Sequence, residues 1–235
     1  VKIIVNGAGA SAVSCAKLYI SLGAKKENIL MLDSKGVIKP SRGNLTEQKE
    51  YFANEVAAST LEEAIKDADV FLGLSKGNIL SAKMIKTMAP SPIVFACANP
   101  DPEISYNLAI KSREDIILAT GRSDHPNQVN NVIGFPFIFR GAMDVNATTI
   151  NEEMKIAAVK AIADLAKEPV PEEVSKAYNL KNLVFGKEYI IPKPTDPRLI
   201  SIVAPAVAKA AMDSGVAQSE IKNWEAYKQD LISRM

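Results

Sequence analysis

Residues 2–12, with the sequence KIIVNGAGASA, join a short apolar segment to a turn that contains two glycines. The apolar positions within residues 2–6 are continuous rather than alternating, which predicts a strand buried on both faces. From Ser11 to Leu22, apolar and small side chains recur three and four positions apart, a spacing that predicts one buried face of a helix. Gly7 and Gly9 stand between these segments, so the stretch predicts a strand, a tight turn and a helix in direct succession.

More apolar strands follow this helix. The second strand is predicted at residues 29–33 (ILMLD) and completes a strand–helix–strand unit. Three further buried strands are predicted, each followed by a polar or glycine-containing turn, at residues 70–74, 93–97 and 116–119. The sequence therefore predicts an α/β fold of Rossmann-like, doubly wound type, with a mostly parallel sheet and helices on both faces.

The segments between and after these strands are more polar or more helical. Residues 34–51 predict a surface loop followed by a short helix, and residues 61–68 predict a helix for which Thr60 and Glu63 match a capping box.

The second half of the chain contains two longer predicted helices. One covers an alanine-rich stretch from Asn151 to Ala166, and a closing amphipathic helix runs from about Arg198 to Met212. A proline-rich connection separates them, and a polar tail with Trp224 follows. We therefore expect a Rossmann core at residues 1–168 and a helical C-terminal extension at residues 169–235.

The glycine turn matches the G-x-G-x-x-G/A pattern of dinucleotide-binding loops. In that pattern the first glycine permits the tight turn, the second lets the backbone approach a pyrophosphate, and the third small residue lets the helix pack on the strand. The glycines could instead serve the turn alone, but their place between a strand and a helix favours a dinucleotide site. The predicted loop residues are Gly7, Ala8, Gly9, Ala10, Ser11 and Ala12.

An acid follows the loop at the spacing expected for a ribose contact. Asp33 ends the second strand, 21 residues after Ala12. A carboxylate that binds the ribose 2′-hydroxyl favours NAD, whereas nearby cations could bind the 2′-phosphate of NADP. Ser34 is a further candidate cofactor contact, and Lys35, Arg42 and Lys49 lie in the same segment, so either cofactor is compatible with the sequence.

Bulk composition gives no reason to expect a nucleic acid or membrane partner. The formal net charge of the 235-residue chain is +1, with 28 Lys plus Arg against 27 Asp plus Glu. No apolar run approaches the roughly 18 residues of a membrane span, and an opening directly on a strand favours the absence of a signal peptide. Cys15 and Cys97 lie in largely apolar segments, which favours free thiols and a cytoplasmic protein.

Several stretches together resemble the malic enzymes, particularly their compact prokaryotic form. The similar segments include VNGAGA (5–10), LDSKGVI (32–38), ANPDPEI (98–104), TGRSDHPNQVNN (120–131), INEEMK (150–155) and PTDPR (194–198). The resemblance implies an enzyme that oxidatively decarboxylates (S)-malate to pyruvate and CO2, with NAD or NADP and with Mg²⁺ or Mn²⁺. It also implies a small-molecule substrate and a homodimer or larger oligomer.

The resemblance assigns site roles to three residues of the later turns. Asn99 and Asn131 resemble two family asparagines at the substrate and nicotinamide end of the cleft, where Asn99 also contacts the cofactor. Ser75 resembles a family position that lines the cofactor. The alternatives are structural: a turn residue before Pro100 for Asn99, a helix cap for the Asn130–Asn131 pair, and a loop cap for Ser75.

Other polar residues of these turns receive no site role. His125 is the sole histidine, and we expect it to order its loop through a hydrogen bond rather than act as a base. Asp101 and Glu103 could suggest a metal pair, but solvent exposure explains them equally well.

The resemblance places the family's catalytic tyrosine and lysine, and its three acidic metal ligands, upstream of the glycine loop. We therefore expect no catalytic residue and no metal ligand in this segment, which would bind cofactor without turning over malate by itself. Two alternatives remain open: a stand-alone dinucleotide-binding module, or another Rossmann dehydrogenase of amino-acid or methylene-tetrahydrofolate type.

Overall fold

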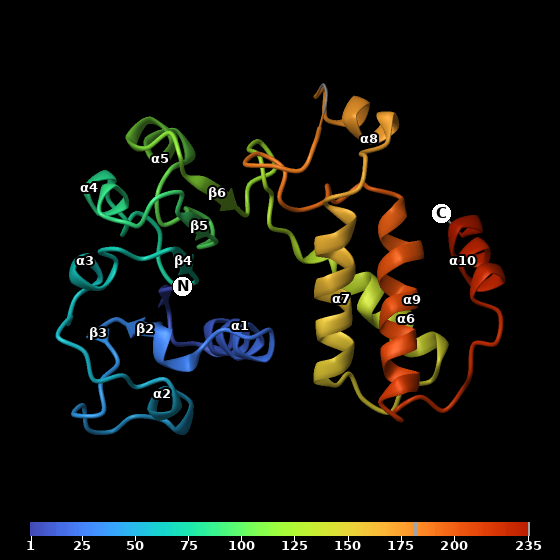
Figure 1. The fold of residues 1–235 in the computed structure, drawn as a ribbon, viewed down its shortest axis with the longest axis horizontal. Coiled ribbons are helices and arrows are strands. Elements are labelled where there is room, and N and C mark those ends of the chain that lie inside the picture. Colours follow the sequence, from blue (N-terminus) through green and yellow to red (C-terminus); the bar gives the residue numbers. More distant parts are fainter. Residues whose placement is uncertain (181–182, 235) are drawn as a thin grey trace. The chain divides into compact units, whose positions relative to one another are not determined.

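The computed structural model describes residues 1–180 and 183–234. The chain consists of two compact units, Val1–Val129 and Asn130–Met235 (Figure 1). This division falls earlier in the chain than residue 168, because the helices directly after Val129 pack on a helix near the C-terminus.

The first unit is built on a six-stranded sheet with the order β3-β2-β1-β4-β5-β6. Its strands are β1 (Ile3–Asn6), β2 (Ile29–Asp33), β3 (Gly36–Val37), β4 (Val70–Gly73), β5 (Ile93–Ala96) and β6 (Ile117–Thr120). All neighbouring strands pair in parallel except β3, which pairs antiparallel with β2. The predicted mostly parallel, Rossmann-like sheet is therefore confirmed.

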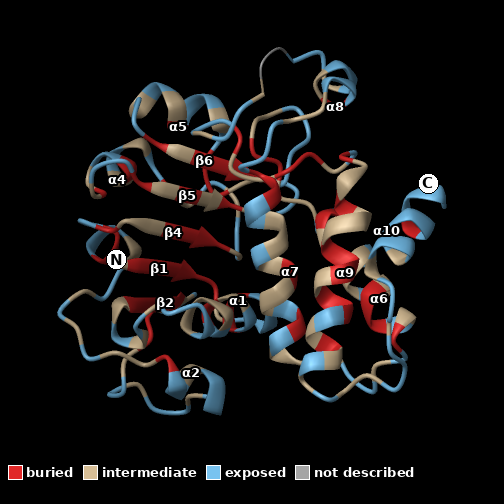
Figure 2. Ribbon diagram, turned by 45° about the vertical axis from the view of Figure 1, so that its right-hand side comes forward, coloured by how far each residue is buried: buried red, intermediate tan, exposed pale blue. Residues whose placement is uncertain are grey.

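Alternate residues of each strand point to opposite faces of the sheet, and both faces are covered. Ile4 belongs to a buried cluster that includes residues of α3, α4 and α5, whereas Ile3 and Val5 belong to a second cluster with Ala12 and Val13 of α1. Figure 2 shows the resulting burial of β1, β2 and β4. This double coverage explains why the strands are continuously apolar in sequence.

Apart from α1, the helices of the first unit are short, with three to seven residues each. They are α1 (Ala10–Ser21), η1 (Lys26–Asn28), α2 (Glu47–Tyr51), α3 (Leu61–Ala64), α4 (Ala82–Lys86) and α5 (Tyr106–Ser112). The Thr60–Glu63 capping box is confirmed, but the helix that it opens ends at Ala64 rather than at residue 68.

The second unit is helical among its described residues. Its helices are η2 (Asn131–Ile133), α6 (Phe135–Asp144), α7 (Glu152–Leu165), α8 (Glu172–Ala177), α9 (Arg198–Asp213) and α10 (Trp224–Ser233). The polar tail that contains Trp224 forms helix α10, which Asn223 caps and in which Leu231 is buried. No helix within residues 1–180 and 183–234 is long and apolar enough to cross a membrane.

Helix α9 forms the centre of the second unit and contacts α6, α7 and α10. Its buried face includes Leu199, Val203 and Val207, which belong to one apolar cluster with Met154 of α7. Helix α6 packs closely on α9 at Gly141, where an added Cβ would overlap the Ala204 carbonyl oxygen.

We predict that Gly141→Ala destabilises the protein by roughly 1–3 kcal/mol, because its Cβ would stand against backbone that cannot move independently. Besides the Ala204 carbonyl, the new methyl would lie 2.9 Å from Val207 Cβ. Urea unfolding measures the effect. Gly134→Ala is the matched control, because its Cβ would meet only side-chain methyl carbons at 3.7 Å; equal stability of the two variants would contradict the close helix contact.

Candidate functional site

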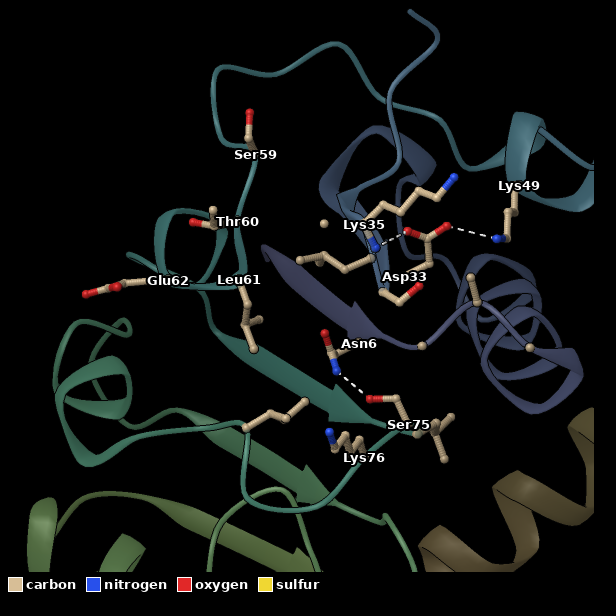
Figure 3. Close-up of a pocket in the computed structure, with 18 of the residues that line it drawn as sticks. Asn6, Asp33, Lys35, Lys49, Ser59, Thr60, Leu61, Glu62, Ser75 and Lys76 are labelled. Atoms are coloured by element: carbon tan, nitrogen blue, oxygen red, sulfur yellow. Dashed lines mark hydrogen bonds and ion pairs between the residues drawn. The ribbon is translucent and has the colours of Figure 1, made fainter. Parts of the chain in front are cut away.

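A pocket of about 890 Å³ opens at the carboxyl ends of β1, β2 and β4 (Figure 3). It is lined by the last residues of β1 and β2, Asn6 and Asp33, by turn residues such as Ser75, and by Ser59–Glu62 around the start of α3. Open α/β sheets bind ligands at this edge, and about 300–1,000 Å³ is the usual size of a small-molecule site. The pocket is therefore the candidate cofactor site.

The two loop glycines have different local environments. Gly7 has a φ of +134°, and an added Cβ would lie 2.7 Å from the Leu74 carbonyl oxygen, so both the turn and the packing require glycine. An added Cβ at Gly9 would meet no described atom within 4 Å, although Gly9 lines the pocket. The fold therefore requires Gly7, whereas Gly9 leaves open space at the pocket wall.

Helix α1 begins at the pocket without a side-chain cap. Its N-cap residue is Gly9, and its first turn contains no acidic residue. In the same unit, α2, α3 and α4 begin with Thr46, Thr60 and Ser81, whose side chains each accept a hydrogen bond from a first-turn N–H. The uncapped N–H groups and the helix dipole of α1 suit an anion in the pocket.

The other residues of the predicted loop either precede this helix start or form its first turn. Ala8 lines the pocket, Ala10 and Ser11 open the helix as exposed residues, and Ala12 is 1% exposed against the sheet. The small side chain at position 12 therefore allows the close helix–strand packing that the sequence pattern predicts.

Asp33 is the centre of a cationic cluster on the pocket wall. Its carboxylate accepts one hydrogen bond from Lys49 Nζ at 2.8 Å and one from the Lys35 backbone N–H at 2.9 Å (Figure 3). It accepts two more from Arg42 Nη2, at 3.0 and 2.8 Å. Arg42 also donates to the carbonyl oxygens of Gly36 and Val37. The acceptor capacity of the carboxylate is therefore already used within the protein.

Burial alone raises the pKa of Asp33, but the hydrogen bonds from Arg42, Lys49 and the Lys35 backbone outweigh it. The pKa of this carboxyl is held well below its ordinary value. Asp33 is thus ionised at neutral pH and orders the two cations. Lys35, Lys49 and Lys76 line the same pocket.

Ser75 and Asn99 follow neighbouring strands, β4 and β5. Ser75 lines the pocket, and its Oγ accepts a hydrogen bond of 2.6 Å from Asn6 Nδ2 (Figure 3). Asn99 precedes a cis peptide bond to Pro100 and is not among the residues that line this pocket.

Asn131 lies in the second unit, whereas Ser75 and Asn99 lie in the first. It is the first residue of η2, whose cap is Asn130; the Asn130 side chain accepts a hydrogen bond from the Val132 N–H. The capping alternative is thus confirmed for Asn130, and the site role of Asn131 stays a prediction.

The expectation of solvent exposure is wrong for Glu103, which is 0% exposed. Its carboxylate accepts hydrogen bonds from the Ala98 N–H at 3.0 Å and from the Ser75 N–H at 3.4 Å. Sequence reasoning missed this residue, because an acid between Pro102 and Ile104 in a polar turn gives no sign of burial. The sequence signal for this burial is the pair Gly73 and Gly77, which have no side chains where Glu103 and Asp101 pack against them.

The remaining residues considered from the sequence are also located. The His125 ring stacks on Tyr106 with centroids 4.4 Å apart. Cys15 and Cys97 are free thiols, and burial raises the pKa of Cys97 to about 12.

A family model described as malic enzyme, NAD binding domain, matches residues 1–183. The chain belongs to this malic enzyme family. A probable NADP-dependent malic enzyme of Rickettsia prowazekii is 55% identical over 235 residues, which are 100% of this chain and 31% of the relative. An NAD-dependent malic enzyme of Rhizobium meliloti is 49% identical over 227 residues, covering 96% of this chain and 30% of the relative.

A solved malic enzyme structure from Pyrococcus horikoshii has a TM-score of 0.84 and 33% identity, covering 99% of this chain and 53% of that one. The chain therefore spans between about a third and a half of the proteins it matches, and it corresponds to the NAD(P)-binding part of the malic enzymes.

The described residues do not fit the divalent metal that the malic enzyme family implies. Within residues 1–180 and 183–234, no group of three or more His, Cys, Asp or Glu side chains is placed to hold a metal ion. Asp33 forms ion pairs with Arg42 and Lys49, and Glu103 accepts hydrogen bonds from backbone N–H groups.

We predict that Asp33→Asn lowers the free energy of unfolding by roughly 1–2 kcal/mol at pH 7, because Arg42 and Lys49 lose their common anion. The pKa of Asp33 is lowered in the folded protein, so its contribution is complete above the ordinary value of about 3.9 and is lost as the pH falls below it. Urea unfolding of both proteins should show a difference that narrows below about pH 4.

Asp164→Asn is the control for this prediction, because its carboxylate is 75% exposed beside Lys167. A pH-independent gap between Asp33→Asn and the wild-type protein would contradict the assignment.

Proposed function

We propose that this chain is the cofactor-binding part of an enzyme that oxidatively decarboxylates (S)-malate to pyruvate and CO2 with reduction of NADP. The observation that carries the proposal is the pocket at the uncapped start of α1, in a chain that belongs to the malic enzyme family. With its pyrophosphate bound there, the dinucleotide would supply the hydride acceptor for C2 of malate.

The pyrophosphate lies at the N-terminus of α1 in this proposal. Gly9 leaves the space that a phosphate needs against the backbone, and the first-turn N–H groups of α1 donate to it. Asn6 and Ser75, joined by a hydrogen bond, form the opposite side of the same opening (Figure 3).

The cluster around Asp33 favours NADP over NAD. An acid that serves NAD must accept a hydrogen bond from the ribose 2′-hydroxyl, but this carboxylate already accepts four. Lys49, which it orders, and Lys35 line the pocket and would bind the 2′-phosphate instead. Identity with relatives does not decide this choice, because their names include both cofactors.

The substrate side of the cleft involves residues outside the pocket described above. We assign Asn99 and Asn131 to malate and to the nicotinamide end of the cofactor, since an amide can donate to a carboxylate and accept from a carboxamide or hydroxyl. The divalent ion and the proton-transfer residues belong to parts of the complete enzyme beyond this chain.

We predict that Gly9→Ala weakens NADP binding at least tenfold while leaving the thermal unfolding midpoint nearly unchanged. The added methyl meets no described atom of the protein but would occupy the space assigned to the pyrophosphate. Isothermal titration with NADP measures the effect. Gly43→Ala is the matched control, because its Cβ also meets nothing within 4 Å and Gly43 does not line the pocket. Equal dissociation constants for the wild-type protein and Gly9→Ala would place the pyrophosphate elsewhere.

The activity is tested on the complete protein that contains this chain, by following malate-dependent formation of NADPH and pyruvate. We expect a higher kcat/KM for malate with NADP than with NAD. Lys35→Ala should lower the NADP value roughly fivefold, as the loss of one charge-assisted contact of about 1 kcal/mol, and change the NAD value less than twofold.

Lys25→Ala is the control for the cofactor preference, because Lys25 is exposed and does not line the pocket. Absence of malate-dependent reduction with either cofactor would contradict the proposed activity. A clear preference for NAD would contradict only the cofactor assignment.

A further inference from the structure

Glu103 is a fully buried acid that takes part in no ion pair among the described residues. Both carboxylate oxygens accept from backbone: Oε2 from the Ala98 N–H at 3.0 Å and Oε1 from the Ser75 N–H at 3.4 Å. Ala98 immediately precedes Asn99, and Ser75 lines the pocket. The two hydrogen bonds therefore join the turns after β4 and β5 at the candidate cofactor site.

The backbone of the same segment reinforces this connection. The Glu103 carbonyl oxygen accepts from the Leu80 N–H at 2.9 Å, and the Pro102 carbonyl oxygen accepts from the Asn78 N–H at 3.0 Å. The turn after β4 is thus held to the turn after β5 by both main chain and side chain.

Two glycines make this close approach possible. An added Cβ at Gly73, the last residue of β4, would overlap the Glu103 carboxyl group and lie 2.7 Å from its Oε2. An added Cβ at Gly77 would lie 2.6 Å from the Asp101 carbonyl oxygen. The segment Asp101–Glu103 therefore fits against backbone that has no room for side chains.

A buried carboxylate is an expensive way to join two loops. Burial raises the pKa of Glu103, and only backbone hydrogen bonds oppose that effect. An apolar side chain would avoid the desolvation of a carboxylate, but it would leave the N–H groups of Ala98 and Ser75 without this acceptor. What the acid supplies is a fixed orientation of both turns.

We propose that Glu103 is a positioning residue of the cofactor cleft, whose carboxylate holds the backbone of Ser75 and Ala98 so that Ser75 and Asn99 face the nicotinamide dinucleotide. The inference rests on the proposed function of the pocket. It requires two acceptor oxygens, because each faces an N–H donor. A glutamine offers one acceptor and turns its NH₂ group toward the other donor.

The test uses Glu103→Gln in the complete protein, with NADP binding measured by isothermal titration at a temperature where circular dichroism shows full folding. We predict a dissociation constant roughly five- to thirtyfold above the wild-type value, the range expected when one buried N–H loses its acceptor. A residue with a merely structural role would lower the unfolding midpoint and leave the affinity of the folded protein unchanged.

Asp115→Asn is the matched control. Asp115 also accepts a backbone N–H bond, from Ser91 at 2.6 Å, but at the amino ends of β5 and β6. The Asp115→Asn variant should be less stable, because Arg113 loses its carboxylate partner. Its NADP affinity should stay within twofold of the wild-type value.

A double-mutant cycle with Ser75→Ala shows whether Glu103 acts through Ser75. The loss of affinity caused by Ser75→Ala should be smaller in the Glu103→Gln background than in the wild-type protein. Equal losses in both backgrounds would overturn the role assigned to the Ser75 turn.

Glu103→Asp is the second variant, because it keeps the charge and both acceptors but withdraws them by one methylene, and it should also weaken NADP binding. The inference is overturned if a folded variant binds NADP within twofold of wild type, or if neither variant folds, which would make Glu103 a residue of stability alone. A wild-type protein that binds no dinucleotide would instead contradict the proposed function.

Discussion

The pairing of β1 with β2 on one side and β4 on the other is the constraint on which the site depends. At the end of β1 the Gly7 N–H donates to the Leu32 carbonyl oxygen, and the Asn6 carbonyl oxygen accepts from the Leu74 N–H, both at 2.9 Å. The chain must therefore leave β1 between two neighbouring strands and turn directly into α1. Only glycine fits at position 7, and the helix start is directed at the opening between the strand ends.

The chemical character of the pocket follows from this geometry. Uncapped N–H groups of α1 and the lysines on the wall favour anionic groups. The two acids of the site, Asp33 and Glu103, both bind groups of the protein itself, but in different ways. Cations lower the pKa of Asp33, whereas burial raises the pKa of Glu103 despite its backbone donors. In the proposed binding mode, Asp33 arranges charge at the adenosine end of the cofactor, and Glu103 arranges backbone at the other end.

The sequence predicts the features that repeat along the chain. Continuous apolar strands, the glycine turn and the small residue at position 12 follow from periodicity and spacing, and the observed strands begin and end within one residue of the predicted bounds. The two-residue strand β3 is too short to give a pattern; it contains Gly36, which has a φ of +95° and lies against the Ser59 carbonyl. Short helices such as α4 and α5 are missed for the same reason.

The sequence does not show which residues, distant along the chain, the side chains of the site bind or pack against. Asp33 was expected to be an acceptor for the ribose, but its bonds to Arg42 and Lys49 depend on how residues 34–51 fold back over β2. Glu103 was expected in solvent, and its burial depends on contact with Gly73, 30 residues earlier in the chain. In both cases the residue type was visible, whereas the partner required the fold.

Amide hydrogen exchange of the complete protein with and without NADP tests the central claim most directly. If the pyrophosphate lies at the uncapped start of α1, saturating NADP should slow exchange at the N–H groups of Gly9 to Ala12 more than at the first turns of α2, α3 or α4, which side chains already cap. Unchanged exchange at Gly9 to Ala12, with protection elsewhere, would contradict the account.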